Sequence, residues 1–541
     1  MALETIRRAA VGFSIGLLLS GSAYAHEGEE EKVLGVTTPA YSGGPLTGAS
    51  FAKSNIELMA HMPFSTIGGV ASDVLGNDVW GWIDSTTGKE YALVGRRDGT
   101  AFVDVSNPAS PTYLGLLPSH TTVKSDWRDI EVYQDHAFVV ADNAGFHGMQ
   151  VFDLTQLRGV TTPTTFTETA SYNDQLQRRG HTISINTDSG YAYINGSNTF
   201  SGGLHVVDIR NPAAPVFAGS YAADGYVHDA QVVNYHGPDA DYAGREVAFA
   251  SNSATVNGPY SLTIVDVTNK SAPAQVSKSS YPQAGYAHQG WLTPDQRFFI
   301  MDDELDEVNV QTQNGGVAPP TRTHIWNVEN LDAPVYVGFH EGTMHTIDHN
   351  LYIKGNLVFQ GNYESGLRVL ELTDVANGGM TEVAYFDTYP LGDGISFNGV
   401  WSAYPFLESG TILVNDRQYG LFVLRFKPDT FMLGDMDGDG DLDNFDIQPF
   451  ELALTESDEY RAQFPLLTDY SERGDIDGNN VFDNFDIQAF EALLTADEPG
   501  ASMAVPEPSG LVLGAIGTVL ASLFSARYQR RRIIRDDLVG R

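Results

Sequence analysis

Four histidines recur at equivalent positions of a repeating sequence unit, and they are the residues best suited to chemistry. When the units are aligned on their first predicted strands, the positions in register are Trp80, Asp129, His181, His228, His288, His349 and Asn398. Imidazole and carboxylate groups together suit a transition metal such as Zn, Mn or Fe, or a general acid–base pair. Asp229 and Asp348 each adjoin one of these histidines and could fix its tautomer.

Three interpretations of these positions are open. In the first, His181, His228, His288 and His349 are ligands of a transition metal. In the second they line a structural or ligand-binding polar channel, and in the third they serve catalysis without a metal. A catalytic base would be Asp129 or Asp303. The sequence has no Gly-x-Ser-x-Gly elbow and no phosphate-binding loop, which counts against serine hydrolase and nucleotide chemistry.

Two acidic segments nearer the C-terminus have the spacing of calcium-binding loops. Oxygen ligands recur at loop positions 1, 3, 5, 9 and 12, and position 7 would contribute a backbone carbonyl. The predicted calcium residues are Asp435, Asp437, Asp439, Asp441, Asp443 and Asp446 in the first loop, and Asp475, Asp477, Asn479, Val481, Asp483 and Asp486 in the second. A solvated acidic loop would not repeat this register, so we expect bound calcium at both.

The calcium segments also resemble a known family. Position 12 is Asp instead of the bidentate Glu of an EF-hand, and residues 447–454 and 487–494 are predicted to form short helices. In these respects residues 431–496 resemble a type I dockerin pair. The resemblance implies a cohesin-like partner, and a purely structural calcium clamp is the alternative.

The histidines must be positioned by a repeated β structure. A short β run that ends in Asp or an equivalent residue and leads into a turn occurs seven times, at residues 101–108, 149–155, 204–212, 262–269, 324–330, 367–374 and 421–426. Each copy follows another short apolar strand, and four strands per unit are predicted. This pattern predicts an all-β, seven-bladed β-propeller over residues 51–430, with the aligned positions converging near its axis.

One segment before the first unit has no partner within its own unit. Residues 55–63 resemble the outer strands at 113–118 and 383–390, whereas the seventh unit ends after its third strand. We therefore expect this N-terminal strand to complete the last blade, which would remove the open edge of the circular array.

The propeller region resembles the choice-of-anchor B proteins, which carry LVIVD-type repeats. The stretches that carry the resemblance are residues 226–233, 286–292, 301–307 and 347–353, and the similarity extends over about residues 50–430. It implies a shared propeller body and a variable anchor. It implies no particular reaction.

Both ends of the chain read as targeting segments. Arg7 and Arg8, an apolar run and Ala23-Tyr24-Ala25 predict a signal peptide over 1–25, followed by a leader over 26–50. A Pro-Glu-Pro linker over 497–509, an apolar stretch over 510–526 and a basic tail over 527–541 resemble a PEP-CTERM sorting signal. The resemblance implies an exosortase as partner and a membrane helix; an ordinary tail anchor is the alternative.

Composition agrees with an exported, surface-located protein. The formal net charge is −38, with 69 acidic and 31 basic residues, which disfavours nucleic-acid binding. There is no cysteine, which excludes disulfides and thiolate sites. We expect a surface module that binds an extracellular glycan or protein. The alternative is a metal-dependent lyase or hydrolase on extracellular polysaccharide, with Arg96, Arg97 and Arg417 holding an acidic substrate.

Overall fold

The computed structural model of the chain describes residues 51–494, apart from ten short gaps. The gaps are residues 70–73, 175–178, 256–258, 310–317, 427–431, 438–441, 443–445, 465–466, 468–469 and 480. The predicted signal peptide, leader, linker, sorting helix and basic tail lie outside the described residues, as do Asp439, Asp441 and Asp443. Among the helices that are described, none is both long and apolar enough to cross a membrane.

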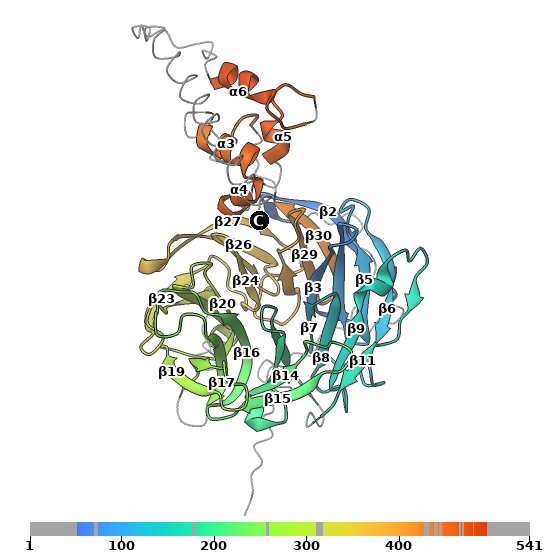
Figure 1. Cartoon of the computed structure of the whole chain (residues 1–541), viewed down its shortest axis with the longest axis vertical. Coiled ribbons are helices and arrows are strands. Elements are labelled where there is room, and N and C mark those ends of the chain that lie inside the picture. Colours follow the sequence, from blue (N-terminus) through green and yellow to red (C-terminus); the bar gives the residue numbers. More distant parts are fainter. Residues whose placement is uncertain are drawn as a thin grey trace, which may run out of the picture. The chain divides into compact units, whose positions relative to one another are not determined.

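Seven mainly antiparallel sheets are arranged around a common centre (Figure 1). The innermost strands are β3 (Gly76–Asp84), β7 (Arg128–Tyr133), β12 (Thr182–Asn186), β16 (Gly225–Asn234), β20 (Ala287–Leu292), β24 (Leu351–Lys354) and β28 (Val400–Tyr404). Each of them contacts the innermost strand of the next sheet, and β28 contacts β3, so the ring is closed. The predicted all-β, seven-bladed propeller is confirmed.

The middle strands of each sheet are the most apolar. The second strands are β4 (Lys89–Arg96), β8 (His136–Ala141), β13 (Tyr191–Asn195), β17 (Glu246–Thr255), β21 (Phe298–Asp303), β25 (Leu357–Gly361) and β29 (Thr411–Asp416). The third strands are β5 (Gly99–Asp104), β9 (Met149–Asp153), β14 (Leu204–Asp208), β18 (Ser261–Asp266), β22 (Arg322–Asn327), β26 (Leu367–Asp374) and β30 (Gly420–Phe426). Both faces of these strands are covered by neighbouring blades, which is why their sequences read as continuous apolar runs.

The outer strands complete the sheets. They are β6 (Thr112–Pro118), β11 (Ala170–Tyr172), β15 (Val216–Tyr221), β19 (Ala274–Ser280), β23 (Val335–Glu341), β27 (Gly379–Phe386) and β2 (Ile56–Met62). β2 pairs antiparallel with β30, so the sheet of β28, β29 and β30 takes its outermost strand from the N-terminal side of the propeller. Two short strands, β1 (Lys53–Ser54) and β10 (Thr164–Thr165), extend the edges beside β27 and β6.

The remaining described elements are short. Four helices follow the propeller in the sequence: α3 (Ile447–Thr455), α4 (Ser457–Gln463), α5 (Tyr470–Gly474) and α6 (Asp486–Leu494). Single 3₁₀ turns lie at Phe64–Thr66, Leu154–Leu157, Phe200–Gly202 and Val375–Asn377. The chain divides into two compact units, residues 1–487 and 488–541, and of the second unit only residues 488–494 are described.

Apolar packing between blades holds the ring together. Phe102 on β5 is fully buried and stacks on Phe152 of β9 in the next sheet, with ring centroids 4.8 Å apart. Both rings belong to one buried cluster that also contains Phe166. Such an aromatic pair adds to the free energy gained from burying the two rings.

We predict that Phe102→Ala lowers the free energy of unfolding by about 3–5 kcal/mol, because it removes a buried ring and leaves a cavity between two blades. Denaturant-induced unfolding would measure the change. Leu391→Ala is the control: this side chain is 71% exposed, and its removal should change stability by less than about 0.5 kcal/mol. Equal effects of the two variants would contradict the role assigned to inter-blade packing.

Candidate functional site

Side chains of the inner strands bind the backbone of the next blade. The hydrogen bonds run from Ile130 N–H to Asp78, Ile183 N–H to Asp129, Ile185 N–H to Glu131, Leu292 N–H to Gln231 and Leu351 N–H to Gln289, at 2.6–3.0 Å. Each bond satisfies a backbone donor that has no neighbouring strand on that side. These bonds fix how consecutive inner strands are offset, and hence where the residues beside them lie.

The four aligned histidines come together in one buried cavity. They are 2–5% exposed, and the cavity has a volume of about 20 Å³. Its lining comprises Trp127, Arg128, Asp129, His181, Thr182, His228, Asp229, His288, Glu304, His349, Asn350, Tyr352 and Trp401. A cavity of this size has room for about one water molecule or one ion.

The Nδ1 atom of every one of these histidines faces a hydrogen-bond acceptor. His228 Nδ1 lies 2.9 Å from the carbonyl oxygen of His288, and His349 Nδ1 lies 2.6 Å from that of Trp401. A carbonyl can only accept, so these two Nδ1 atoms carry the proton. His181 and His288 direct Nδ1 at carboxylate oxygens, of Asp142 and Asp302, both at 3.2 Å. The two carbonyl contacts assign the Nδ1–H tautomer to His228 and His349.

In His228 and His349 this tautomer leaves the Nε2 lone pair directed at other groups of the cavity. His181 Nε2 and His228 Nε2 lie 2.9 Å apart, which is a hydrogen-bond distance. Either His181 donates an Nε2 proton to His228 or a cation lies between the two nitrogens. Two imidazole nitrogens bound to one metal ion at about 2.0–2.1 Å lie roughly 3 Å apart, close to the separation observed.

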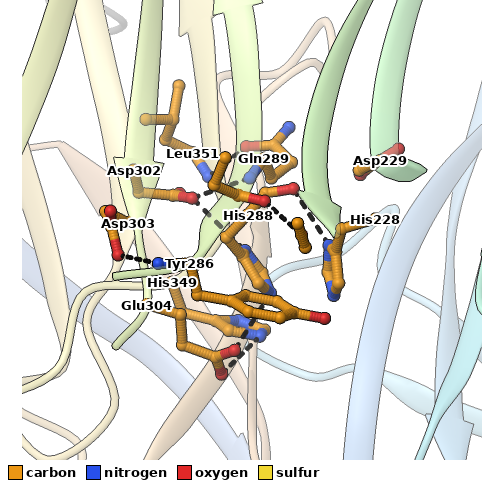
Figure 2. Close-up of polar contacts among 12 residues, drawn as sticks. His228, Asp229, Tyr286, His288, Gln289, Asp302, Asp303, Glu304, His349 and Leu351 are labelled. Atoms are coloured by element: carbon orange, nitrogen blue, oxygen red, sulfur yellow. Dashed lines mark hydrogen bonds and ion pairs between the residues drawn. The ribbon is translucent and has the colours of Figure 1, made fainter. Parts of the chain in front are cut away.

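Glu304 joins two of the histidines (Figure 2). Its two carboxylate oxygens lie 3.7 Å from His288 Nε2 and 3.6 Å from His349 Nε2, and one ligand atom from each residue lies within 4.8 Å of the others. Tyr363 donates its hydroxyl to Glu304 Oε1 at 2.7 Å, whereas Oε2 has no hydrogen-bond partner among the described residues. The three side chains together can therefore hold a metal ion.

Burial sets the charge states of this group. Desolvation, reinforced by the neighbouring imidazoles, lowers the pKa of His288 well below its usual range. Burial also lowers the pKa of His349 to about 3. Both rings are thus neutral near pH 7, which is the form that binds metals. For Glu304, burial raises the pKa to about 8, so without a nearby cation the carboxyl group tends to hold a proton.

The two proposed bases occupy different places. Asp129 lines the cavity, but one of its oxygens accepts the Ile183 N–H of the next blade at 2.6 Å. Asp303 does not line the cavity, and its oxygens accept hydrogen bonds from Tyr281 Oη, Gly285 N and Tyr286 N. The structure therefore brings Asp129 to the histidines and leaves Asp303 apart from them.

Two further aligned positions also lie outside the cavity lining. Trp80 packs its ring against Tyr352 and Tyr404, and Asn398 donates to Glu364 and accepts from Gln418. Among the described residues, the groups that face Nδ1 of the four histidines are Asp142, Asp302 and two backbone carbonyls, and not Asp229 or Asp348.

Alignment of the inner strands did not select Glu304 as a ligand. It follows β21, a second strand, and so it is not in register with the histidines. The signal in the sequence is the acidic run Asp302-Asp303-Glu304 at the end of an apolar strand. The alignment also did not select Arg128, which is fully buried and lines the cavity beside Asp129.

The arginines expected to hold an acidic substrate already have acidic partners. Arg96 is completely buried and makes two hydrogen bonds to the carboxylate of Asp98. Arg97 lies 2.9 Å from Asp126. Arg417 stacks over the Trp401 ring and lies 3.8 Å from the same Asp126. Their charges are therefore largely compensated within the chain.

The two calcium-type segments adopt the same local geometry. Asp446 Oδ1 accepts the N–H groups of Met436 and Asp437, and Asp486 Oδ1 accepts those of Ile476 and Asp477. In each segment three carboxylates offer ligand atoms within 4.8 Å of one another: Asp435, Asp437 and Asp446 in the first, and Asp475, Asp477 and Asp486 in the second.

The other described residues of the two segments lie around these carboxylates. Asn479 donates its side-chain amide to Asp477, Asp483 accepts the N–H of Phe485, and the side chain of Val481 is exposed. In the first segment the buried guanidinium of Arg473 lies 3.0 Å from Asp435 Oδ2.

Comparisons with known proteins agree with the repeat. The LVIVD repeat family model matches residues 88–116, 179–223 and 256–280, which fall on β4–β6, β12–β15 and β18–β19. The chain thus carries LVIVD repeats. No curated protein sequence matches it significantly.

Several solved structures align with part of this chain. Hydrazine synthase of Kuenenia stuttgartiensis aligns with 62% of this chain and 91% of its own, at 12% identity and a TM-score of 0.43. A protein from Lactobacillus plantarum aligns over 63% and 87% of the two chains, at 12% identity and a TM-score of 0.41. The Cps50 (Swd1) β-propeller domain of Myceliophteria thermophila covers 65% and 95%, at 11% identity and a TM-score of 0.40. Similarity at this level says nothing about what the chain binds.

We predict that Gln289→Leu lowers the free energy of unfolding by about 1–3 kcal/mol, because the buried Leu351 N–H loses its acceptor. Chemical denaturation would measure the effect. Gln156→Leu provides the comparison, since this side chain is exposed and makes only a 3.5 Å contact with Thr169. A Gln289 variant as stable as the Gln156 variant would show that the inter-blade hydrogen bonds contribute little.

Proposed function

We propose that this chain is an exported surface protein whose propeller binds a transition-metal ion on its axis and a ligand or partner on its surface. The observation that carries the metal assignment is the convergence of His288, Glu304 and His349 in a cavity large enough for one ion. Zn, Mn and Fe are the metals that accept two imidazoles and a carboxylate.

The hydrogen bonds behind the ligands support this assignment. Metal-binding histidines in proteins usually donate their second N–H to a carboxylate or a backbone carbonyl, which fixes the tautomer and the ring orientation. All four histidines of the cavity have such a partner at Nδ1. His288, His349 and Glu304 would coordinate the ion. His228 and His181 line the same cavity and are the candidates for further coordination. A bound ion would supply Lewis acidity and would keep Glu304 ionised.

The geometry favours a binding module over a polysaccharide lyase or hydrolase. A cavity of about 20 Å³ does not admit a sugar ring, so a glycan would have to bind outside it. The three arginines that an acidic polysaccharide would require are paired with Asp98 and Asp126. An extracellular glycan or protein that contacts the propeller surface is the partner we propose.

The acidic segments and the chain ends complete the proposal. The segments around Asp435 and Asp475 would each hold a calcium ion, and the repeated three-carboxylate geometry supports this. A dockerin-like pair would bind a cohesin-like domain, or would serve as a structural clamp. The same proposal includes a relationship to the choice-of-anchor B proteins and export of the chain. It also includes an exosortase that acts on the C-terminal sorting signal.

We predict that the purified full chain, incubated with Zn, Mn or Fe and then dialysed, retains about one equivalent of transition metal. Elemental analysis should find most of it lost in His288→Ala, His349→Ala and Glu304→Gln, because each change removes one of three converging ligands. His205→Gln is the control: His205 is equally buried but is bonded to Tyr172 and Thr199, outside the cavity. Folded wild-type protein that retains no metal would overturn the assignment.

We predict that Asp475→Asn removes one equivalent of bound calcium, because it deletes a charged ligand at the first position of its loop. Equilibrium dialysis against radioactive calcium would count the ions. Asp458→Asn is the matched control, since its side chain is 97% exposed and lies outside both segments. An unchanged calcium content in Asp475→Asn would contradict a calcium site there.

A further inference from the structure

A second group of buried acidic residues lies near the histidines in sequence but contains no imidazole. Asp306 and Glu307 follow β21, and Asp348 precedes β24. All three are 0–2% exposed, and one carboxylate oxygen from each lies within 4.8 Å of the others. The neighbouring residues Val308 and Ile347 belong to one apolar cluster, which holds the two segments together.

Most oxygens of this acidic group have no hydrogen-bond donor. Both carboxylate oxygens of Glu307, both of Asp348 and Oδ1 of Asp306 make no hydrogen bond with any residue that the structure describes. By contrast, Asp416, which is also fully buried, accepts hydrogen bonds from Thr388, Gln418 and Tyr419. Leaving a buried carboxylate without donors costs several kcal/mol, so the group requires a partner.

The charge balance leads to the same conclusion. Among the described residues, Arg322 supplies a positive charge at 3.4 Å from Asp306 Oδ2, against three carboxylates. Three such groups can coexist only if they take up protons or bind a cation.

We propose that Asp306, Glu307 and Asp348 bind a calcium ion inside the propeller, at a site separate from the axial histidines and from the two C-terminal segments. All the donors are oxygens, which favours a hard cation over the metals that prefer imidazole. Mg²⁺ gives up its water reluctantly and usually keeps several, whereas Ca²⁺ accepts carboxylates in mono- or bidentate fashion at a dry site.

The ion would also position part of the histidine centre. Asp348 directly precedes His349, and Asp306 lies two residues after Glu304. An ion that joins Asp348 to Asp306 and Glu307 would therefore link the two chain segments that present His349 and Glu304. This role follows from the calcium site and does not require a metal at the axis.

The test uses the full chain in a background that carries Asp435→Asn and Asp475→Asn, so that neither C-terminal segment contributes. In equilibrium dialysis at micromolar calcium, this background should retain about one equivalent. Asp348→Asn and Glu307→Gln, added separately, should each abolish it, because two carboxylates bind Ca²⁺ much more weakly than three. Asp416→Asn should leave the equivalent in place. His288→Ala should also retain the calcium while losing any transition metal, which separates this proposal from the axial one.

Two results would overturn the proposal. The first is a folded background protein that retains no calcium. The second is retention of calcium after both substitutions, which would place the ion elsewhere. If the carboxyl groups share protons instead, Asp348→Asn should raise the melting temperature in chelator, and calcium should stabilise the background protein no more than the variant. Circular dichroism melts of the background protein and of the Asp348→Asn variant, each in calcium and in chelator, would distinguish these cases, and Glu307→Gln serves if Asp348→Asn does not fold.

Discussion

The side-chain hydrogen bonds between consecutive inner strands are the constraint on which the site depends. An innermost strand has a neighbouring strand on one side only, so its other backbone donors need partners from elsewhere. Asp129, Gln231 and Gln289 provide such partners for the next blade. Each bond contributes about 0.5–1.5 kcal/mol, but losing one leaves a buried donor without an acceptor, which costs more. The ring therefore tolerates little sliding between blades, and the histidines beside these bonds keep their separations.

The axial histidine cavity and the proposed calcium site offer different kinds of ligand atom. The axial cavity combines imidazoles held neutral by burial with one carboxylate, whereas Asp306, Glu307 and Asp348 offer oxygens only. Imidazole ligands suit a transition metal, whereas a site made only of oxygens suits a hard cation such as calcium. The two sites therefore select different metals, although the same two chain segments contribute to both. The strongly acidic composition, with a net charge of −38, would raise the local concentration of either cation.

Much of the architecture could be predicted from the sequence, because a propeller repeats. The recurring Asp-ended strands gave the number of blades, and their alignment brought together His181, His228, His288 and His349, which do meet in one cavity. The alignment could not tell which way a side chain points where pairing is irregular. The pairing of β20 with β21 shifts register between Ala287 and Gly290, and the pairing of β28 with β29 shifts between Val400 and Ser402. Such bulges redirect side chains locally.

The alignment of inner strands also could not predict several individual residues of the site. Glu304 reaches the histidines from beyond the end of a second strand, which no alignment of first strands can detect. Asn398 is in register with the histidines, but Glu364 and Gln418 bind its amide away from the cavity. Asp303 is acidic and near in sequence, yet three donors from the 281–286 segment hold it elsewhere. These outcomes depend on tertiary hydrogen bonds, which local pattern does not encode.

The pairing of β2 with β30 has a consequence for the order of folding. His61 on β2 forms a hydrogen bond with the carbonyl oxygen of Tyr419, 358 residues later in the chain. β2 is synthesised early, but it cannot pair until β30, the last strand of the propeller in the sequence, is available. Contacts of such long range form late and slow the overall rate. Until then the ring is open, with strand edges that invite pairing with other chains. The propeller therefore cannot close until nearly all seven of its blades have been synthesised.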